Sequence, residues 1–138
     1  MANGIDLILQ DHERVNDLFA AFAEAGDSTA IGQILDVLTA HDGAEHAALY
    51  PLAETLLDDE ALLARCKAAH SEVKRLIDYL RAQEGAPLVD AVEALRTAVT
   101  EHVQDEEENL LPALAKVATP AQLEGLAARI EQNKQRVG

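Results

Sequence analysis

Two copies of one short motif carry the residues of this sequence that are best suited to chemistry. Each copy is a histidine followed four residues later by a glutamate, His41 with Glu45 and His102 with Glu106, and a proline lies ten residues after each histidine. Four residues turn an α-helix by about 400°, so each carboxylate should lie one turn along the same helix face as its histidine. The motif therefore places an imidazole and a carboxylate on one face of a helix, twice.

Two further histidines make the motif part of an internal repeat. His12 precedes the first copy and His70 precedes the second, and both are followed by a valine and a leucine at matching positions. The offset is 58 residues between His12 and His70, and 61 residues between His41 and His102. The repeat predicts two similar helical hairpins, related by a pseudo-twofold axis, with matching residues facing one another.

The residue types in this repeat favour a metal site. A single core histidine is more often a hydrogen-bonded packing residue, but four on four facing helices are hard to explain that way. Two buried carboxylates would cost several kcal/mol each without a compensating cation. Imidazole with carboxylate suits iron, manganese or zinc. Six inward ligands exceed the four of tetrahedral zinc, so the repeat predicts two metal ions, about 3.5–4 Å apart, bridged by Glu45 and Glu106.

Four long amphipathic segments must position these residues. Apolar side chains recur every three or four residues, which indicates helices over residues 5–25 and 30–57, from after Asp59 to before Gly85, and from near Pro87 onward. Thr119 to Gln122 has the form of a capping box that begins a fifth, short helix, and the polar residues 133–138 should fray. The pattern predicts an all-α protein: an up-down-up-down four-helix bundle with a short fifth C-terminal helix.

Composition limits the function classes. The 138 residues fit a single domain over 1–138, and 49% of them are apolar, which is enough for a core. A net charge of −14 opposes contact with nucleic acid or with an anionic membrane surface. The chain lacks the pattern of a signal peptide and any run long enough to span a membrane, so we expect a cytoplasmic protein. Cys66 is the only cysteine, and a monomer is expected.

In residue type, spacing and helix register, the chain from about Ile5 to Leu114 resembles the hemerythrin family, in its HHE cation-binding branch. The resemblance implies a cofactor of two iron ions, a non-haem di-iron centre inside the bundle with an oxo or hydroxo bridge when oxidised. The residues that would match the terminal nitrogen ligands and the bridging carboxylates are His12, His41, His70 and His102, and Glu45 and Glu106, respectively.

The sequence departs from the oxygen-carrying hemerythrins at Lys74, where those proteins have a second histidine one turn after the one that matches His70. The resemblance then implies that one iron lacks a nitrogen ligand, so that its position stays open, holds water or takes another ligand. Tyr50 is the candidate, because a phenolate suits ferric iron and Pro51 can re-aim its neighbour. The alternative is an interior tyrosine with a hydrogen-bonded hydroxyl. Ideal helix geometry argues against ligation, because it places Tyr50 far round the helix from His41.

Other candidate residues have simpler interpretations. His46 should point about 140° away from His41, as a surface residue or one behind the ligands. Gly43 could open a small-molecule path or let helices approach, and Cys66 is interpreted as a small core residue. The acidic run at residues 101–108 is interpreted mostly as a solvated face.

The resemblance implies a non-haem di-iron protein whose partner is a small oxidant: dioxygen, hydrogen peroxide or nitric oxide. The missing nitrogen ligand favours peroxide or oxygen chemistry over reversible oxygen carriage, and enzymatic turnover stays open. One alternative is a non-enzymatic iron or oxygen sensor, carrier or iron-buffering module, ordered by its metal. Another is a bundle held together by structural zinc or manganese.

Overall fold

All the elements of the computed structural model are helices, and it describes residues 3–26, 28–83 and 89–137. In chain order they are α1 (Gly4–Ala25), α2 (Ser28–Ala44), the π-helical turn η1 (Glu45–Leu49), α3 (Tyr50–Leu56), α4 (Glu60–Ala82), α5 (Val89–Asp105), the π-helical turn η2 (Glu106–Leu110), α6 (Leu111–Val117) and α7 (Pro120–Val137). The predicted limits at Gly85 and Pro87 lie outside the described residues. No described helix is both long and apolar enough to cross a bilayer.

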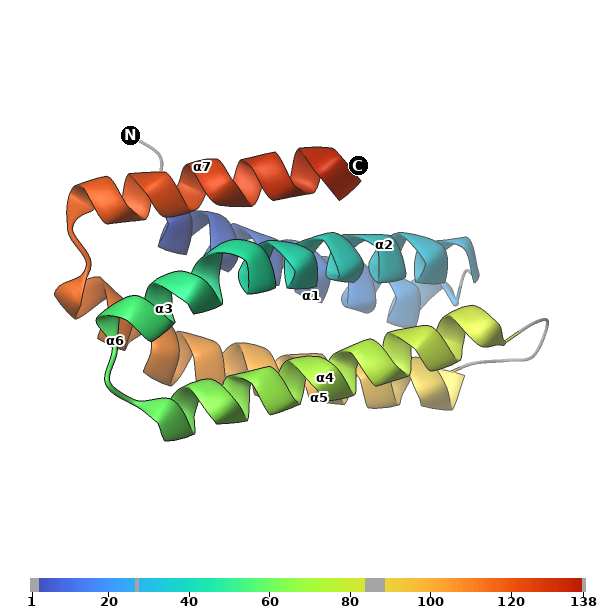
Figure 1. Ribbon diagram of the computed structural model, residues 1–138. Coiled ribbons are helices and arrows are strands. Elements are labelled where there is room, and N and C mark those ends of the chain that lie inside the picture. The colour runs from blue at the N-terminus through green and yellow to red at the C-terminus, as the bar shows by residue number, and fades with distance from the viewer. Residues whose placement is uncertain (1–2, 27, 84–88, 138) are drawn as a thin grey trace.

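The helices form the predicted all-α bundle. Four rods make it up, namely α1, the continuous run α2–η1–α3, α4, and the continuous run α5–η2–α6. In Figure 1, α1 and α2 lie together on one side, α4 and α5 lie together on the other, and successive rods run in opposite directions. The up-down-up-down topology expected from the sequence is therefore confirmed.

Side-chain caps set the ends of several helices. The carboxamide of Asn3 accepts the backbone N–H of Ile5 at 2.8 Å and so begins α1. Gly26 ends the same helix with φ of 63°, a left-handed conformation that glycine adopts without strain. The capping box also forms, because the N–H of Gln122 donates to Thr119 Oγ1 at 3.1 Å and the N–H of Thr119 donates to Gln122 Oε1 at 2.8 Å.

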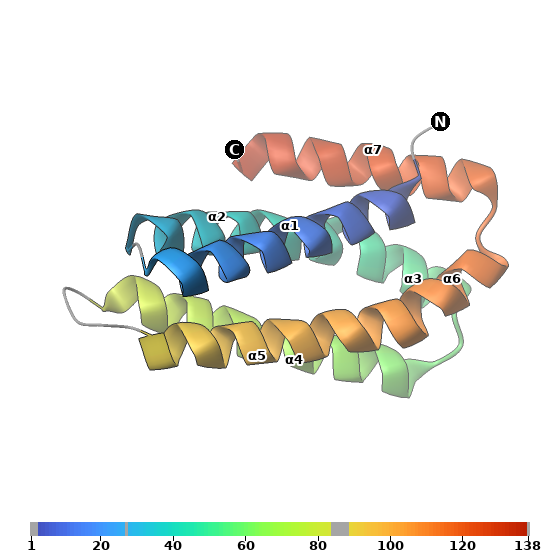
Figure 2. The ribbon, with the colours of Figure 1, turned by 180° about the vertical axis from the view of Figure 1, so that it is seen from behind.

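The fifth helix, α7, is longer than the sequence predicts. It has 18 residues and continues through most of the segment that should fray. Figure 2 shows α7 lying across α1 and α2 on the outside of the bundle. Leu126 and Ile130 bury its apolar edge, and Lys134 forms an ion pair with Asp11 of α1. These tertiary contacts stabilise a polar end that would fray in an isolated helix.

Gly4 permits the close approach of α1 to α7. A Cβ at this position would lie 2.7 Å from Leu126 Cβ, closer than packed side chains allow. We expect Gly4→Ala to lower the free energy of unfolding by about 1–3 kcal/mol, in spite of the better helix propensity of alanine. Gly32→Ala is the matched control, because a Cβ there meets nothing within 4 Å and should raise stability slightly. Urea unfolding followed by circular dichroism measures both, and a stabilised Gly4→Ala would contradict the packing argument.

A π-helical turn follows each His-x-x-x-Glu motif. The N–H of Tyr50 bonds to the carbonyl of Glu45, five residues back, and the N–H of Leu111 bonds in the same way to Glu106. Each turn is followed by a proline in the first positions of the next helix. Proline has no N–H and its ring clashes with the carbonyl four residues earlier, which favours the wider turn. The extra residue rotates the side chains that follow it.

Two apolar clusters sandwich a polar layer in the middle of the bundle. On α1, His12 lies between Ile8, which belongs to one cluster, and Val15, which belongs to the other. On α4, His70 lies in the same way between Cys66 and Val73. The core is therefore continuous except at one level, where the polar side chains of four rods meet.

Candidate metal centre

Six polar side chains fill the middle layer. They come from all four rods, and each residue keeps between 0 and 6% of its surface exposed: His12, His41, Glu45, His70, His102 and Glu106. The structure thus brings together all six residues that the repeat singles out. Ionisable side chains are rarely buried without partners, so this layer is a strong departure from an ordinary helical core.

The six residues form two overlapping clusters. The first cluster is His12, His41, Glu45 and Glu106, and the second cluster is Glu45, His70, His102 and Glu106. Within each cluster the four candidate ligand atoms lie within 4.8 Å of one another. The two glutamates belong to both clusters and the four histidines divide between them, as the pseudo-twofold repeat predicts.

Each glutamate turns one oxygen toward each cluster. Oε2 of Glu45 lies 3.1 Å from His41 Nε2 in the first cluster, and its Oε1 lies 2.5 Å from His70 Nε2 in the second. Oε1 of Glu106 lies 3.2 Å from His12 Nε2, and its Oε2 lies 2.9 Å from His102 Nε2. This is the arrangement in which two carboxylates can bridge two cations.

The first cluster contains unpaired polar atoms that fit a cation. His12 Nε2, His41 Nε2, Glu45 Oε2 and Glu106 Oε1 are all buried, and none has a hydrogen-bond partner among the described residues. An unpaired buried polar atom costs about 1–3 kcal/mol, and more if it is charged. These four atoms come from three of the rods and face one another, with nitrogen–oxygen distances between 3.1 and 3.7 Å. Imidazole nitrogen and carboxylate oxygen are ligand types for iron, manganese or zinc, so the residues fit a metal ion.

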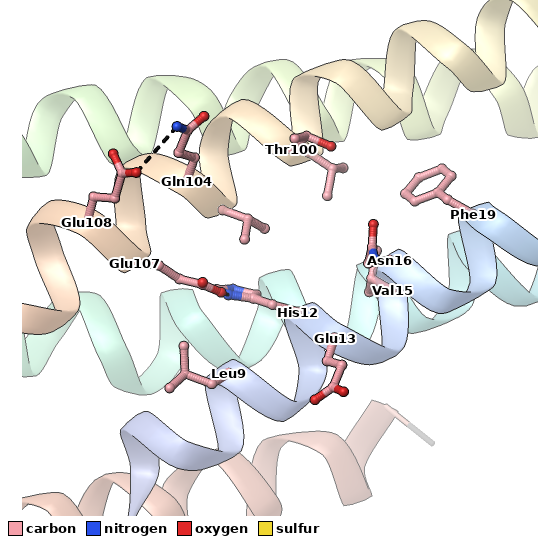
Figure 3. A pocket seen from close by; sticks show the side chains of 12 residues that line it. Leu9, His12, Glu13, Val15, Asn16, Phe19, Thr100, Gln104, Glu107 and Glu108 are labelled. Atoms are coloured by element: carbon pink, nitrogen blue, oxygen red, sulfur yellow. Dashed lines mark hydrogen bonds and ion pairs between the residues drawn. The ribbon is translucent and has the colours of Figure 1, made fainter.

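Two carboxylates hold the imidazoles of the first cluster from outside. His12 Nδ1 donates to Glu107 Oε2 at 2.7 Å, and His41 Nδ1 donates to Asp11 Oδ2 at 3.0 Å. Figure 3 shows the Glu107 side chain directed at the ring of His12. A proton on Nδ1 leaves the Nε2 lone pair free to face the cluster, which is the tautomer that binds a metal.

Without a metal, His12, His41 and His102 take up protons to balance the negative charge of the layer. Burial alone would lower the pKa of His12, but its contacts with Glu106 and Glu45 outweigh burial and raise the pKa to about 9. Burial likewise acts to lower the pKa of His102 and of His41, but their carboxylate neighbours outweigh it. They raise the pKa of His102 to about 10 and that of His41 well above its usual value. Burial would raise the pKa of Glu45, but the charge of His41 holds it well below its usual value. Imidazolium charge therefore replaces the cation in the metal-free protein.

Tyr50 points into the centre because of the π-helical turn. Tyr50 keeps only 1% of its surface exposed, and its hydroxyl donates a hydrogen bond to Glu106 Oε2 at 3.1 Å. Burial, followed by the charges of Glu45 and Glu106, raises the pKa of the phenol, so the hydroxyl keeps its proton. The structure therefore shows the interior tyrosine with a hydrogen-bonded hydroxyl, and the extra residue of η1 changes the register that an ideal helix would give Tyr50 relative to His41. Ligation by Tyr50 stays a prediction.

The other residues that the sequence singled out lie around the centre. His46 is exposed and outside both clusters, with its ring edge-on to His70 at a centroid distance of 4.7 Å. Lys74 is also exposed. A Cβ on Gly43 would lie 3.2 Å from Asn133 Oδ1, so this glycine lets α2 and α7 approach.

Sequence reasoning missed the outer carboxylates. Glu107 was assigned with its neighbours to a solvated face, but it holds His12, and Asp105 accepts two hydrogen bonds from Arg65 at 2.7 and 2.8 Å. Asp11 was not singled out, although it directly precedes His12. Asp42 lies 3.8 Å from His70 Nε2, and burial raises its pKa to about 6. The available signal was adjacency to a ligand residue, which does not by itself reveal a side-chain direction.

Two hollows flank the centre. One, of about 490 Å³, lies between α1 and α5, where Figure 3 shows His12, Glu107 and Phe19 on its wall. The other, of about 550 Å³, lies between α2 and α4 and is lined by His70 and Lys74, among others. Each hollow therefore approaches a histidine of a different cluster.

Cys66 belongs to the core, as predicted. The residue has no exposed surface, and burial, then the negative charge of Glu106, raises the pKa of its thiol to about 12. The thiolate is the reactive form, so we expect the folded protein to react with a disulfide reagent at least ~100-fold more slowly than the protein in urea. Absorbance of the released thiol measures both rates. Equal rates would show that the thiol is accessible in the native fold.

Known proteins resemble this chain in sequence and in fold. Residues 3–114 match the hemerythrin HHE cation-binding domain. A protein of Nostoc sp. strain PCC 7120 named DNA nickase is 33% identical over 138 residues, a match that covers 96% of this chain but 39% of that protein, so the chain spans about two fifths of its relative. The crystal structure of a hemerythrin HHE cation-binding domain-containing protein from Mycobacterium kansasii superposes with a TM-score of 0.81 at 25% identity, covering 99% of this chain and 90% of that chain. The chain belongs to the hemerythrin HHE cation-binding domain family.

Proposed function

We propose that the protein is a non-haem di-iron protein that binds or turns over a small oxidant, with a preference for peroxide or oxygen chemistry. The observation that carries the proposal is the sharing of both glutamates between two clusters. A single metal ion would need only one of the two clusters. The ligand residues proposed are His12 and His41 for one ion, His70 and His102 for the other, and Glu45 and Glu106 for both.

Two iron ions bound there would supply paired redox changes and coordination for dioxygen, hydrogen peroxide or nitric oxide. The chain itself holds and screens the centre. Glu45 and Glu106 would offer one oxygen to each ion and so keep the ions close together. The apolar clusters on both sides exclude water and limit what reaches the layer to small molecules. Tyr50 would donate its hydrogen bond to Glu106 or ligate the ion of the second cluster as a phenolate.

The hollow beside His70 is the proposed route for the small molecule. It reaches a buried ligand residue at the position where Lys74 replaces the histidine of the oxygen-carrying hemerythrins. The exposed lysine adds no imidazole to the second cluster, and the His46 ring that also lines this hollow lies outside both clusters. The absence of that nitrogen is what favours turnover over reversible carriage.

The activity named for the Nostoc relative is not part of the proposal. This chain matches less than half of that protein. Its net charge of −14 opposes close contact with a phosphate backbone. We therefore keep the prediction that the chain itself binds neither nucleic acid nor anionic membranes, and that it acts as a cytoplasmic monomer.

Metal analysis of the protein, purified after growth without metal supplements, tests the proposal. We expect two iron ions per chain and near-ultraviolet absorption by a coupled ferric pair. Stoichiometric zinc or manganese with little iron would instead support a structural role. A visible absorption band that is lost in Tyr50→Phe would assign the phenolate, and an unchanged spectrum would leave Tyr50 as a hydrogen-bond donor.

Turnover separates an enzyme from a sensor or an iron buffer. The iron-loaded protein should consume hydrogen peroxide faster than the same concentration of free iron. His41→Ala is the control, since it removes a proposed ligand of the first ion and should reduce both iron content and consumption. Consumption no faster than that of free iron would support the non-enzymatic alternative.

A further inference from the structure

The two clusters share their inner ligands but differ in what holds them from outside. The repeat that relates His12 to His70 also relates His46 to Glu107. These two residues directly follow the glutamates of the two motifs, and they are 61 residues apart, as the motif residues are. The same repeat relates Asp11 to Ala69, which precede the two lone histidines. The carboxylates on one side of the pseudo-twofold axis therefore have an imidazole and a methyl group as counterparts.

In the first cluster, both imidazoles are fixed by carboxylates. Glu107 accepts from His12 Nδ1 at 2.7 Å, and Asp11 accepts from His41 Nδ1 at 3.0 Å. Asp11 is itself held by the ammonium group of Lys134, which comes from α7. These contacts restrict the two rings to the orientation that directs Nε2 at the cluster.

In the second cluster, neither imidazole has a carboxylate on Nδ1, and the carboxylate of Asp42 lies 3.8 Å from Nε2 of His70, beyond hydrogen-bond distance. Nδ1 of His70 and Nδ1 of His102 are buried and have no hydrogen-bond partner among the described residues. The ring of His46 meets His70 edge-on, with an angle of 72° between the ring planes, and makes no hydrogen bond to it in the described structure. The side chain of Ala69 has no polar atom to offer. The second pair of imidazoles is therefore less oriented and less electron-rich than the first.

An outer carboxylate changes how strongly an imidazole binds a metal. It fixes the tautomer and the ring plane, and it raises the basicity of the ligating nitrogen. Loss of such a partner typically lowers metal affinity about 10–100-fold. Two partners in one cluster and none in the other should therefore separate the affinities of two positions whose inner ligands are of the same types.

We propose that the two metal positions are unequal: the position of His12 and His41 binds its ion more tightly and fills first, with Asp11 and Glu107 as positioning residues. The position of His70 and His102 is the exchangeable one. This inference rests on the proposed two-metal centre. The hollow beside His70 gives the exchangeable position its path to solvent. In the hollow beside His12, the Glu107 carboxylate is part of the wall and is hydrogen-bonded to the ring (Figure 3).

Titration of the metal-free protein with Co²⁺ tests the inequality without any assay of activity. Calorimetry counts the binding steps, and the visible bands of Co²⁺ report the ligands of each. We expect two steps at least ~10-fold apart in affinity. Asp11→Asn and Glu107→Gln should each weaken the tighter step by about 10–100-fold and leave the weaker step nearly unchanged. Asp11→Glu, which keeps the carboxylate, should restore part of the loss.

Two variants complete the design. Glu108→Gln makes the same chemical change at an exposed residue next to Glu107, and it should alter neither step. Ala69→Asp introduces the counterpart of Asp11 and should strengthen the weaker step. Thermal unfolding of each metal-free variant shows whether the fold is intact.

The outcomes distinguish this inference from the proposed function. Two steps of equal affinity, or an Asp11→Asn variant that weakens both steps equally, would overturn the inequality and leave the two-metal centre standing. Binding of fewer than two ions by the unaltered protein would overturn the two-metal centre, and the inequality with it.

Discussion

Replacement of Glu106 by glutamine should remove metal from both positions at once. Its two oxygens face His12 and His102, which belong to different clusters. The amide keeps the size of the side chain but loses the charge and one oxygen ligand. We expect each Co²⁺ affinity to fall by more than the ~100-fold that the loss of an outer hydrogen bond costs. Iron per chain in the purified variant should fall from two to well below one.

The matched control for Glu106→Gln is Glu108→Gln, which makes the same change two residues further along η2. Glu108 is exposed and accepts a hydrogen bond only from Gln104 among the described residues. It should keep full iron content. His102→Ala should spare the position of His12 and His41, so it separates the loss of one ion from the loss of two. Retention of both ions in Glu106→Gln would exclude this carboxylate as a bridge.

The helical bundle could be predicted because its information is local and repeated. Apolar residues at spacings of three and four give each rod one inward face, and the four histidines lie on those faces. The repeat added the long-range part, since matching residues in two hairpins must face one another. These patterns predicted that the four histidines and the two glutamates lie close together, namely His12, His41, His70, His102, Glu45 and Glu106. The structure brings these six side chains together.

The π-helical turns could not be read from an ideal helix. In the two rods that carry the motif, a period of 3.6 residues describes the helix up to Glu45 and Glu106 and then fails for five residues. The prolines that follow were visible, but a proline can bend, end or widen a helix. The choice among these depends on packing. That choice directs Tyr50, which an ideal helix would place far round from His41, to a hydrogen bond with Glu106.

The outer carboxylates and α7 depend on tertiary contacts for the same reason. Glu107 is one of several adjacent acidic residues, and only the position of α1 distinguishes it from Glu108. The end of α7 is polar, which predicts fraying in isolation, but Lys134 forms an ion pair with Asp11 on the adjacent helix α1. Single-sequence patterns describe what a segment prefers and omit the partner that decides between similar alternatives.

The metal-free protein should lose stability as the pH rises from about 6.5 to about 10, and bound metal should abolish this loss. His12 and His102 titrate near pH 6.5 when unfolded, but their pKa values in the fold are about 9 and about 10. A raised pKa means that the folded chain binds the proton more tightly. The stabilisation is therefore complete below pH 6.5 and disappears by about pH 10, at about 1.4 kcal/mol per pH unit for each proton.

Urea unfolding of the metal-free protein at several pH values measures this slope. His46→Gln is the control: His46 is exposed, and burial followed by the charge of His70 lowers its pKa, so its removal should leave the decline in place. His102→Gln should remove the part of the decline that His102 contributes between about pH 6.5 and about pH 10. A flat profile for the unaltered protein would mean that the imidazoles are neutral when the metal is absent.

Metal binding should release the same histidine protons. The imidazoles of His12, His41 and His102 must lose their Nε2 protons before they can bind an ion, so protonation of these histidines competes with the metal. The apparent affinity for Co²⁺ should therefore rise with pH over the same range in which the metal-free fold weakens. Calorimetry in buffers of different ionisation enthalpy counts the protons released. Release of no protons on binding would show that the imidazolium–carboxylate layer does not balance the two glutamates in the metal-free protein.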